Sequence, residues 1–171
     1  KTFLNAKGRK LNSLEVHDLV CMIGDVVVVG GVRRSALISL SNLSDKRMRE
    51  AKMGNWFDKD KTPWRRIANN SVAYSEKPDM ETFIDEWISL IKSKSGERGI
   101  FNRVASQKQA AKWGRRDDSL NYGTNPCSEI ILRDKQFCNL TECVVRVDDT
   151  KESLLEKVRL ATILGTFQST L

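Results

Sequence analysis

The sequence contains few of the residues that mark several large protein classes. Its 171 residues include one histidine and four cysteines, and no two cysteines form a Cys-x-x-Cys pair. Zinc ribbons hold their ion with such pairs, so a zinc ribbon is disfavoured and we expect no metal site. No apolar run approaches the ~18 residues that a membrane-spanning helix needs. The basic segment 1–10 is not followed by an apolar stretch, which disfavours a signal peptide. We therefore expect a cytoplasmic protein without a membrane partner.

The composition is that of a globular protein with an excess of positive charge. Hydrophobic residues make up 40% and charged residues 30%, and 29 Lys and Arg face 22 Asp and Glu, for a net charge of +7. Such a balance excludes a disordered tail and a coiled fibre. The basic residues are scattered over 1–10, 46–66 and 103–116 and do not line one helix. Nucleic-acid binding is therefore disfavoured, although these regions could converge in space.

Hydrophobic periodicity predicts alternating helices and strands. Asn12 and Glu15 have the spacing of a capping box, and Val16, Leu19, Val20 and Ile23 then recur at helical spacing. These residues predict an amphipathic helix over 13–24. Asp79 is expected to cap a second amphipathic helix, one face of which carries Met80, Phe83, Ile84, Trp87, Ile88 and Ile91. Segment 1–11 is expected to be a loop.

The remaining elements complete an α/β pattern. Strands are predicted over 26–29, 36–41, 68–75, 99–101, 129–132 and 143–147, and helices over 102–112 and from Thr150 to the end. Short buried strands alternating with helices are typical of a parallel sheet or part of a barrel. The last helix has no stop signal, so we expect residues 1–171 to be an internal segment of a larger domain, incomplete at both ends.

The segment Asn125-Pro126-Cys127-Ser128-Glu129 could carry chemistry. If it is extended, Asn125, Cys127 and Glu129 project to the same side, because side chains alternate along extended backbone. A carboxylate beside a thiol disfavours the thiolate, so the set is unsuited to nucleophilic attack. It suits a thiol that stays protonated, or one that reacts by one electron, while Glu129 moves a proton. The alternative is a buried cysteine ahead of a strand, with Glu129 exposed.

The other cysteines divide by context. If segments 129–132 and 136–140 pair as a hairpin, Cys138 returns toward Cys127, and two thiols within reach suggest redox work. Pairing cannot be inferred from sequence alone, because buried free cysteines are common. Cys143 lies in an apolar segment and Cys21 beside the apolar stripe of a helix. Both are interpreted as structural.

A glycine-led loop, Gly30-Gly31-Val32-Arg33-Arg34-Ser35, separates two predicted strands. Glycine lets the backbone approach a ligand closely, and paired arginines offer planar donors to phosphates or base edges. The spacing matches neither common nucleotide-binding glycine motif. A tight turn with solvated arginines stays open as the alternative.

Taken together, these motifs resemble a ribonucleotide reductase catalytic subunit. The resemblance rests on Asn125–Glu129, on Cys138-Asn139-Leu140 and on the loop from Gly30 to Leu40. It extends to Val16-His17-Asp18, Asn69-Asn70-Ser71-Val72 and the segment from Ser95 to Asn102. Proline in second place of Asn-Pro-Cys-x-Glu is most similar to the adenosylcobalamin-dependent class II enzymes.

The resemblance implies a ten-stranded α/β barrel of the ribonucleotide reductase and glycyl radical enzyme type. Cys127 would lie on a central finger loop and hold the thiyl radical that abstracts the 3′ hydrogen of the ribose. Glu129 would take the 3′-hydroxyl proton, Asn125 would hydrogen-bond the substrate, and Cys138 would be one half of the redox pair. Gly30, Gly31, Arg33, Arg34 and Ser35 would form the specificity loop, with Arg33 at its reading position.

The resemblance also implies partners. These are adenosylcobalamin, a ribonucleotide substrate, a deoxynucleotide effector, the remaining segments of the enzyme and an external dithiol reductant such as thioredoxin. The second redox cysteine and the phosphate-binding segments have no counterpart in residues 1–171, so the chain alone is expected to be inactive. A class I diiron catalytic subunit and a basic, non-catalytic nucleic-acid-binding fragment remain the alternatives.

Overall fold

The computed structural model describes residues 2–27, 35–114 and 116–169. The chain divides into two compact units, Lys1–Asp134 and Lys135–Leu171. Each unit is described by itself.

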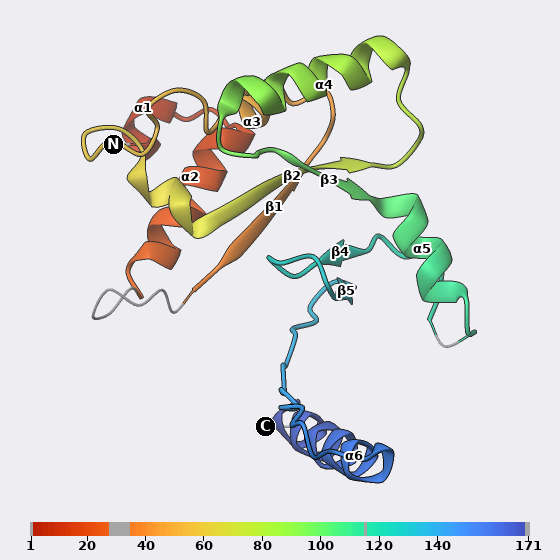
Figure 1. Cartoon of the computed structure of the whole chain (residues 1–171). Coiled ribbons are helices and arrows are strands. Elements are labelled where there is room, and N and C mark those ends of the chain that lie inside the picture. The colour runs from red at the N-terminus through yellow and green to blue at the C-terminus, as the bar shows by residue number, and fades with distance from the viewer. Residues whose placement is uncertain (1, 28–34, 115, 170–171) are drawn as a thin grey trace. The chain divides into compact units, whose positions relative to one another are not determined.

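A three-stranded parallel sheet forms the centre of the first unit (Figure 1). Its strands are β1 (Leu37–Ser41), β2 (Ala68–Tyr74) and β3 (Gly99–Asn102), with β2 in the middle. Leu37 pairs with Ala68, and Ser71 pairs with Gly99. Helices connect the strands, which confirms the predicted α/β class and parallel pairing.

Helices account for most of the remaining regular structure of this unit. They are α1 (Thr2–Ala6), α2 (Ser13–Asp25), α3 (Lys46–Arg49), the 3-10 helix η1 (Pro63–Ile67), α4 (Met80–Ser93) and α5 (Arg103–Ala111). The predicted capping box is confirmed: Asn12 Oδ1 accepts the Glu15 N–H at 3.0 Å, and the Glu15 carboxylate accepts the Asn12 N–H at 2.9 Å. Asp79 caps α4 through the Thr82 N–H, as predicted.

The two faces of the sheet have different neighbours. Strands β4 (Gly123–Thr124) and β5 (Ile131–Leu132) form a separate antiparallel hairpin. On β2, the Asn70 side chain contacts His17 of α2, whereas the Asn69 side chain reaches the Pro126 carbonyl in the loop of that hairpin. On β1, Leu37 lies against Gly24 of α2. Because side chains alternate along a strand, one face of the sheet is directed to helices and the other to the hairpin.

The helix-directed face is held by buried charge. Arg98, just before β3, donates to both carboxylate oxygens of Glu86 on α4, at 3.1 and 2.6 Å. Their side chains are only 1% and 5% exposed. Arg98 also donates to Ser41 Oγ at 2.7 Å and to the carbonyls of the loop after β1, and Arg49 of α3 donates to Glu86. This network joins α3, α4, β1 and β3.

Among the described residues, the apolar stripes of α2 and α4 are not the sides that pack. On α2 the buried residues are His17, Cys21 and Gly24, while Ile23 is 71% exposed. A Cβ on Gly24 would lie 3.0 Å from Ile67, so this helix approaches η1 more closely than a larger residue would allow. On α4 the buried residues are Glu86, Ser89 and Ser93, and the residues of the predicted apolar face that are exposed are Met80, Ile84, Trp87, Ile88 and Ile91.

Several predicted boundaries were wrong. Segment 1–11 contains helix α1, and Val26 and Val27 form a turn after α2 where a strand was expected. Val28 and Val29 lie outside the described residues. Helix α2 runs through Gly24 to Asp25 and ends in a turn, in which the Val26 N–H donates to the Ile23 carbonyl at 3.3 Å. The β-branched character of Val26 and Val27 is therefore not enough to make them a strand.

The second unit contains one long helix, α6 (Lys151–Gln168), which begins with a capping box between Thr150 and Ser153. Residues 143–147 have no regular secondary structure, so the strand predicted there is wrong. Lys157 of α6 contacts both oxygens of Asp149, at 2.7 and 2.6 Å, and donates to the Val144 carbonyl at 3.2 Å. These bonds hold the preceding segment along the helix.

Replacing Glu86 should test the buried network. Glu86→Ala leaves the buried Arg98 guanidinium without its carboxylate, so we expect the free energy of unfolding to fall by about 3–5 kcal/mol in urea denaturation. Asp85→Ala, at the exposed neighbouring position, is the matched control and should change it by less than about 0.5 kcal/mol. Equal effects of the two substitutions would contradict the structural role of this pair.

Candidate functional site

The candidate site is the tip of a short hairpin. Strands β4 (Gly123–Thr124) and β5 (Ile131–Leu132) pair antiparallel, and residues 125–130 connect them. The Ser128 N–H donates to the Asn125 carbonyl at 2.9 Å, which makes 125–128 a β-turn with Pro126 and Cys127 at its two central positions. The thiol of Cys127 is therefore presented at the tip, where it is exposed.

Side chains of the hairpin close this loop. Asn125 Oδ1 accepts the Ile130 N–H at 3.0 Å, and the Thr124 hydroxyl donates to the Ile130 carbonyl at 3.0 Å. Ser128 has a φ of 70°, in the left-handed region, which lets the chain turn back after Cys127. A β-turn followed by a left-handed residue is a common way to build a short hairpin loop.

Contacts with the rest of the first unit anchor the hairpin. Asn69 Nδ2 of β2 donates to the Pro126 carbonyl at 2.7 Å. Arg116 donates to the Ile131 carbonyl at 2.9 Å, and its guanidinium lies 5.0 Å from the ring centre of Tyr122. The Cys127 turn is thus tied to the central strand of the sheet.

The prediction that Asn125, Cys127 and Glu129 project to the same side of an extended segment was wrong. The segment is a turn and is not extended, because the loop-closing hydrogen bonds of Asn125 compete with extended backbone. Cys127 and Glu129 are exposed, whereas Asn125 is buried, with 4% exposure. The structure brings the three together in one loop, with the amide oxygen of Asn125 bound within that loop.

The hairpin on which a return of Cys138 toward Cys127 depended does not form. Segment 131–132 pairs with Gly123–Thr124, and residues 136–140 are not a strand. Residues 131–132 pair with the upstream strand 123–124, because the side chains of Thr124 and Asn125 hydrogen-bond the backbone of Ile130 and hold the two segments together. Cys138 belongs to the second unit and is half-buried.

Most of the glycine-led loop lies outside the described residues. This applies to Gly30, Gly31, Arg33 and Arg34. Ser35 is described, and its hydroxyl lies beside Gly24 of α2.

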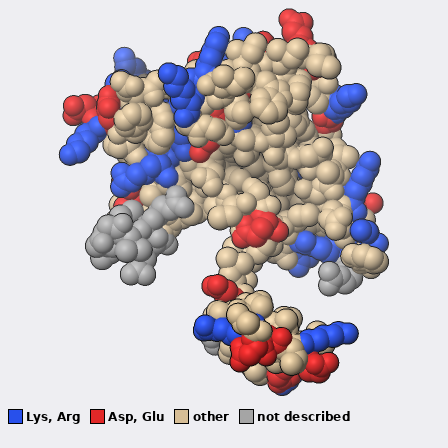
Figure 2. Space-filling view, viewed as in Figure 1, with Lys and Arg blue, Asp and Glu red and all other residues tan. Residues whose placement is uncertain are grey.

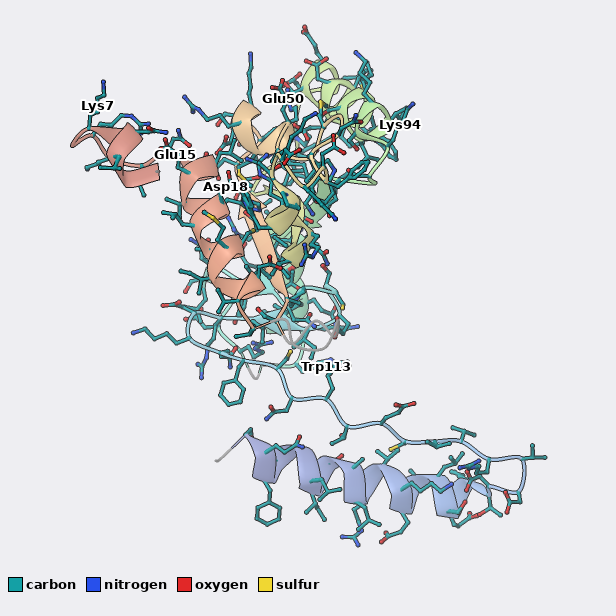
Figure 3. All side chains as sticks on the ribbon, turned by 90° about the vertical axis from the view of Figure 1, so that its left-hand side faces the viewer. Lys7, Glu15, Asp18, Glu50, Lys94 and Trp113 are labelled. Carbon is teal, nitrogen blue, oxygen red and sulfur yellow. The ribbon has the colours of Figure 1, made fainter. Side chains whose placement is uncertain are left out.

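Sequence reasoning did not identify the cluster that buries the only histidine. Asp18 of α2, labelled in Figure 3, receives two hydrogen bonds of 2.6 Å from Arg65 of η1 and one of 3.2 Å from Trp64. His17 Nδ1 lies 3.7 Å from Asp18, and its Nε2 donates to Asn70 Oδ1 at 2.9 Å. This cluster fixes α2 against η1 and β2.

The two segments that contain Asn70 and Glu97, both part of the family resemblance, contact each other beside this cluster. Glu97 accepts the backbone N–H of Asn70 at 3.1 Å and binds Lys52 at 2.9 Å. Lys52 is 6% exposed and also donates to the Ala68 carbonyl. The signal available in the sequence was the presence of polar residues, such as His17 and Asn70, inside predicted apolar elements.

The neighbouring groups of this cluster shift the pKa values of His17 and Asp18. Burial opposes protonation of His17, but hydrogen bonds to Asp18 and Cys21 outweigh it and raise the pKa of His17 to about 9. Burial alone would raise the pKa of Asp18, but Arg65 and His17 hold that pKa well below its usual range. Near neutral pH the cluster therefore holds an imidazolium, a carboxylate and a guanidinium.

Other surface features do not coincide with the predicted site. A polar cavity of about 800 Å³ opens beyond the carboxyl ends of β1 and β2, lined in part by Ser44, Tyr74 and Asp79, and no described candidate residue lines it.

Within the described ranges, no group of three or more His, Cys, Asp or Glu could hold a metal ion. Figure 2 shows Lys and Arg at separate places on the visible face, with Asp and Glu among them. No helix of the described chain is long and apolar enough to cross a membrane.

The chain is similar in sequence to curated proteins of one description. Over 157 residues the chain is 35% identical to an adenosylcobalamin-dependent ribonucleoside-triphosphate reductase of Levilactobacillus brevis, covering 89% of this chain and 20% of that reductase. The chain matches a segment of the adenosylcobalamin-dependent ribonucleotide reductases. The reductase of the same description from Lacticaseibacillus paracasei is 36% identical over 147 residues, covering 81% of this chain and 18% of that protein.

The match to these reductases is partial in length. The chain spans about a fifth of the length of the curated reductases it matches. No family model matches the chain, and no solved structure matches it.

The buried histidine makes stability depend on pH. The ordinary pKa of histidine is 6.5 and that of folded His17 is about 9, so its stabilising contribution is complete below pH 6.5 and is lost as the pH rises through 9. We expect the free energy of unfolding to fall by about 2–4 kcal/mol over this window, measured by urea denaturation at fixed ionic strength. His17→Gln, which does not titrate, should lose this fall; the same pH dependence in both chains would refute the assignment.

Proposed function

We propose that the chain is the part of a class II ribonucleotide reductase that carries the radical cysteine, acting in the reduction of ribonucleotides to 2′-deoxyribonucleotides for DNA synthesis. The observation that carries the proposal is the exposed Cys127 thiol at the tip of an anchored turn, in a chain similar to these reductases over most of its length. The relatives are named triphosphate reductases, which favours a ribonucleoside triphosphate as substrate.

Cys127 has the accessibility that radical chemistry needs. When bound, adenosylcobalamin supplies an organic radical that can take a hydrogen atom from a thiol. An exposed thiol on a tight turn fits this role, because the tip can enter a substrate cavity while the hairpin stays attached to the sheet. In the proposed reaction the Cys127 thiyl radical abstracts the 3′ hydrogen of the ribose.

The remaining residues of the loop assist this step. Glu129 is exposed two residues after Cys127 and takes the 3′-hydroxyl proton. Asn125 is buried, and its amide oxygen accepts the Ile130 N–H, so its amide nitrogen is the atom left for the proposed hydrogen bond to substrate. Cys138 is one thiol of the redox pair that reduces the 2′ position, the second thiol coming from another part of the enzyme. A dithiol protein such as thioredoxin then reduces the pair.

The parallel sheet supports the proposed barrel. Helices lie on one face of β1–β2–β3 and the Cys127 hairpin lies on the other, as expected of a barrel wall with its finger loop inside. In this proposal, residues 1–171 are one segment of a ten-stranded barrel. Other segments of the same cytoplasmic enzyme complete it, and the loop of Gly30, Gly31, Arg33, Arg34 and Ser35 links the deoxynucleotide effector to base choice.

Activity can be tested in a chimaeric reductase. The matched 157 residues of the Levilactobacillus brevis enzyme are replaced by this chain, and reduction of ribonucleoside triphosphates is measured with and without adenosylcobalamin. We expect cobalamin-dependent turnover that Cys127→Ala abolishes, by at least about 10⁴-fold, because the radical carrier is lost. Cys143→Ala, which removes a half-buried thiol outside the loop, is the matched control and should keep turnover within about threefold.

Two outcomes would contradict the proposal. Turnover that requires a second radical-generating subunit and ignores adenosylcobalamin would indicate the diiron class I. An active chimaera that tolerates Cys127→Ala, together with strong salt-dependent binding of the chain to random duplex DNA, would indicate a nucleic-acid-binding fragment.

A further inference from the structure

The Pro126 carbonyl is a point at which the orientation of Cys127 can be controlled. This carbonyl and the Cys127 N–H belong to one rigid peptide plane. In the β-turn 125–128 that plane is the central one, between the second and third residues of the turn. Any group that fixes the carbonyl therefore fixes the backbone immediately before the reactive thiol.

A β-turn has two main states that differ in this plane. Type I and type II turns are related by rotation of the central peptide by about 180°, and type II requires a positive φ at the third residue. Cys127 is not among the residues with positive φ, so the turn lies on the type I side. Rotation to the other state would change φ at Cys127 and redirect its side chain.

Asn69 holds the plane in the observed state. Its Nδ2 donates to the Pro126 carbonyl at 2.7 Å, a bond that rotation of the peptide would break. Asn69 is well placed to act as a fixed donor, because both the side chain and the backbone N–H of the next residue, Asn70, are hydrogen-bonded. The Asn70 side chain accepts from His17 at 2.9 Å and its backbone N–H donates to Glu97 at 3.1 Å.

From this geometry we propose that Asn69 is a positioning residue for Cys127, holding the peptide before the thiol in one of the two turn orientations. The role in turnover rests on the proposed function, whereas the role in thiol geometry does not. Asn69 does not touch the reacting atoms and acts through the Pro126 carbonyl. In the reductase, the bond would keep the Cys127 sulfur aimed at the substrate between turnovers.

The test replaces the donor without changing the size of the side chain. Asn69→Asp puts a carboxylate oxygen opposite the Pro126 carbonyl, and Ser71→Ala, two residues along on the same side of β2, is the control. The rate at which iodoacetamide alkylates Cys127 is measured by peptide mass spectrometry, relative to Cys143 in the same chain. We expect Asn69→Asp to change this ratio by at least about fivefold and Ser71→Ala by less than twofold, at similar urea midpoints.

Turnover provides an independent measurement. In the chimaeric reductase, Asn69→Asp should lower kcat by about 10–100-fold with KM within about threefold, because misplacement of a reacting group affects chemistry more than binding. An unchanged alkylation ratio and unchanged kcat would overturn the positioning role even if Cys127→Ala abolishes turnover. If Cys127→Ala is harmless, the proposed function fails, while the alkylation ratio still decides the geometry.

A measurement on the unsubstituted chain covers the case in which Asn69→Asp does not fold. Nuclear magnetic resonance should then show one Asn69 side-chain amide proton shifted downfield and exchanging slowly with solvent, as a bonded proton does. Two rapidly exchanging Asn69 amide protons would overturn the proposal.

Discussion

The pairing of Arg98 with Glu86 is the constraint around which the first unit is arranged. Both groups are almost fully buried, and an isolated buried charge is too costly to keep. Each therefore has to face the other, which fixes α4 over the start of β3. The remaining donors of Arg98 then capture Ser41 and the carbonyls that follow β1. One ion pair thus sets the spacing of two strands and a helix.

Strand β2 connects this polar interior to the candidate site. Neighbouring residues on it serve opposite faces: Asn70 joins the buried cluster of His17 and Glu97, and Asn69 reaches the turn that carries Cys127. Alternation along a strand makes such a division unavoidable. The contacts of Asn70 fix β2 from the helix side. Asn69, the neighbouring residue, then fixes the Pro126 carbonyl that precedes Cys127. Rigid support on one face and an exposed thiol on the other would suit the radical role proposed for Cys127, which needs the thiol in one orientation.

The apolar periodicity of α2 and α4 located both helices but not the sides that pack within the described residues. A hydrophobic stripe predicts burial only when burial is driven by apolar area. Here the sheet-directed sides carry His17 and Glu86, whose hydrogen bonds and ion pairs make polar burial tolerable. Exposed apolar residues such as Ile23 and Ile91 occur in a chain that spans about a fifth of its curated relatives.

The sequence by itself determined the helix starts at Asn12 and Asp79, the parallel α/β class and the place of Cys127 in the reductase-like motif, because caps, periodicity and motif spacing are local properties. Only the tertiary structure decided that Asn125 closes a turn, that 131–132 pairs with 123–124, and that Asn69 meets Pro126. Asn69 and Pro126 are 57 residues apart in the chain. Contacts at that separation depend on how strands and helices pack, which no local pattern encodes.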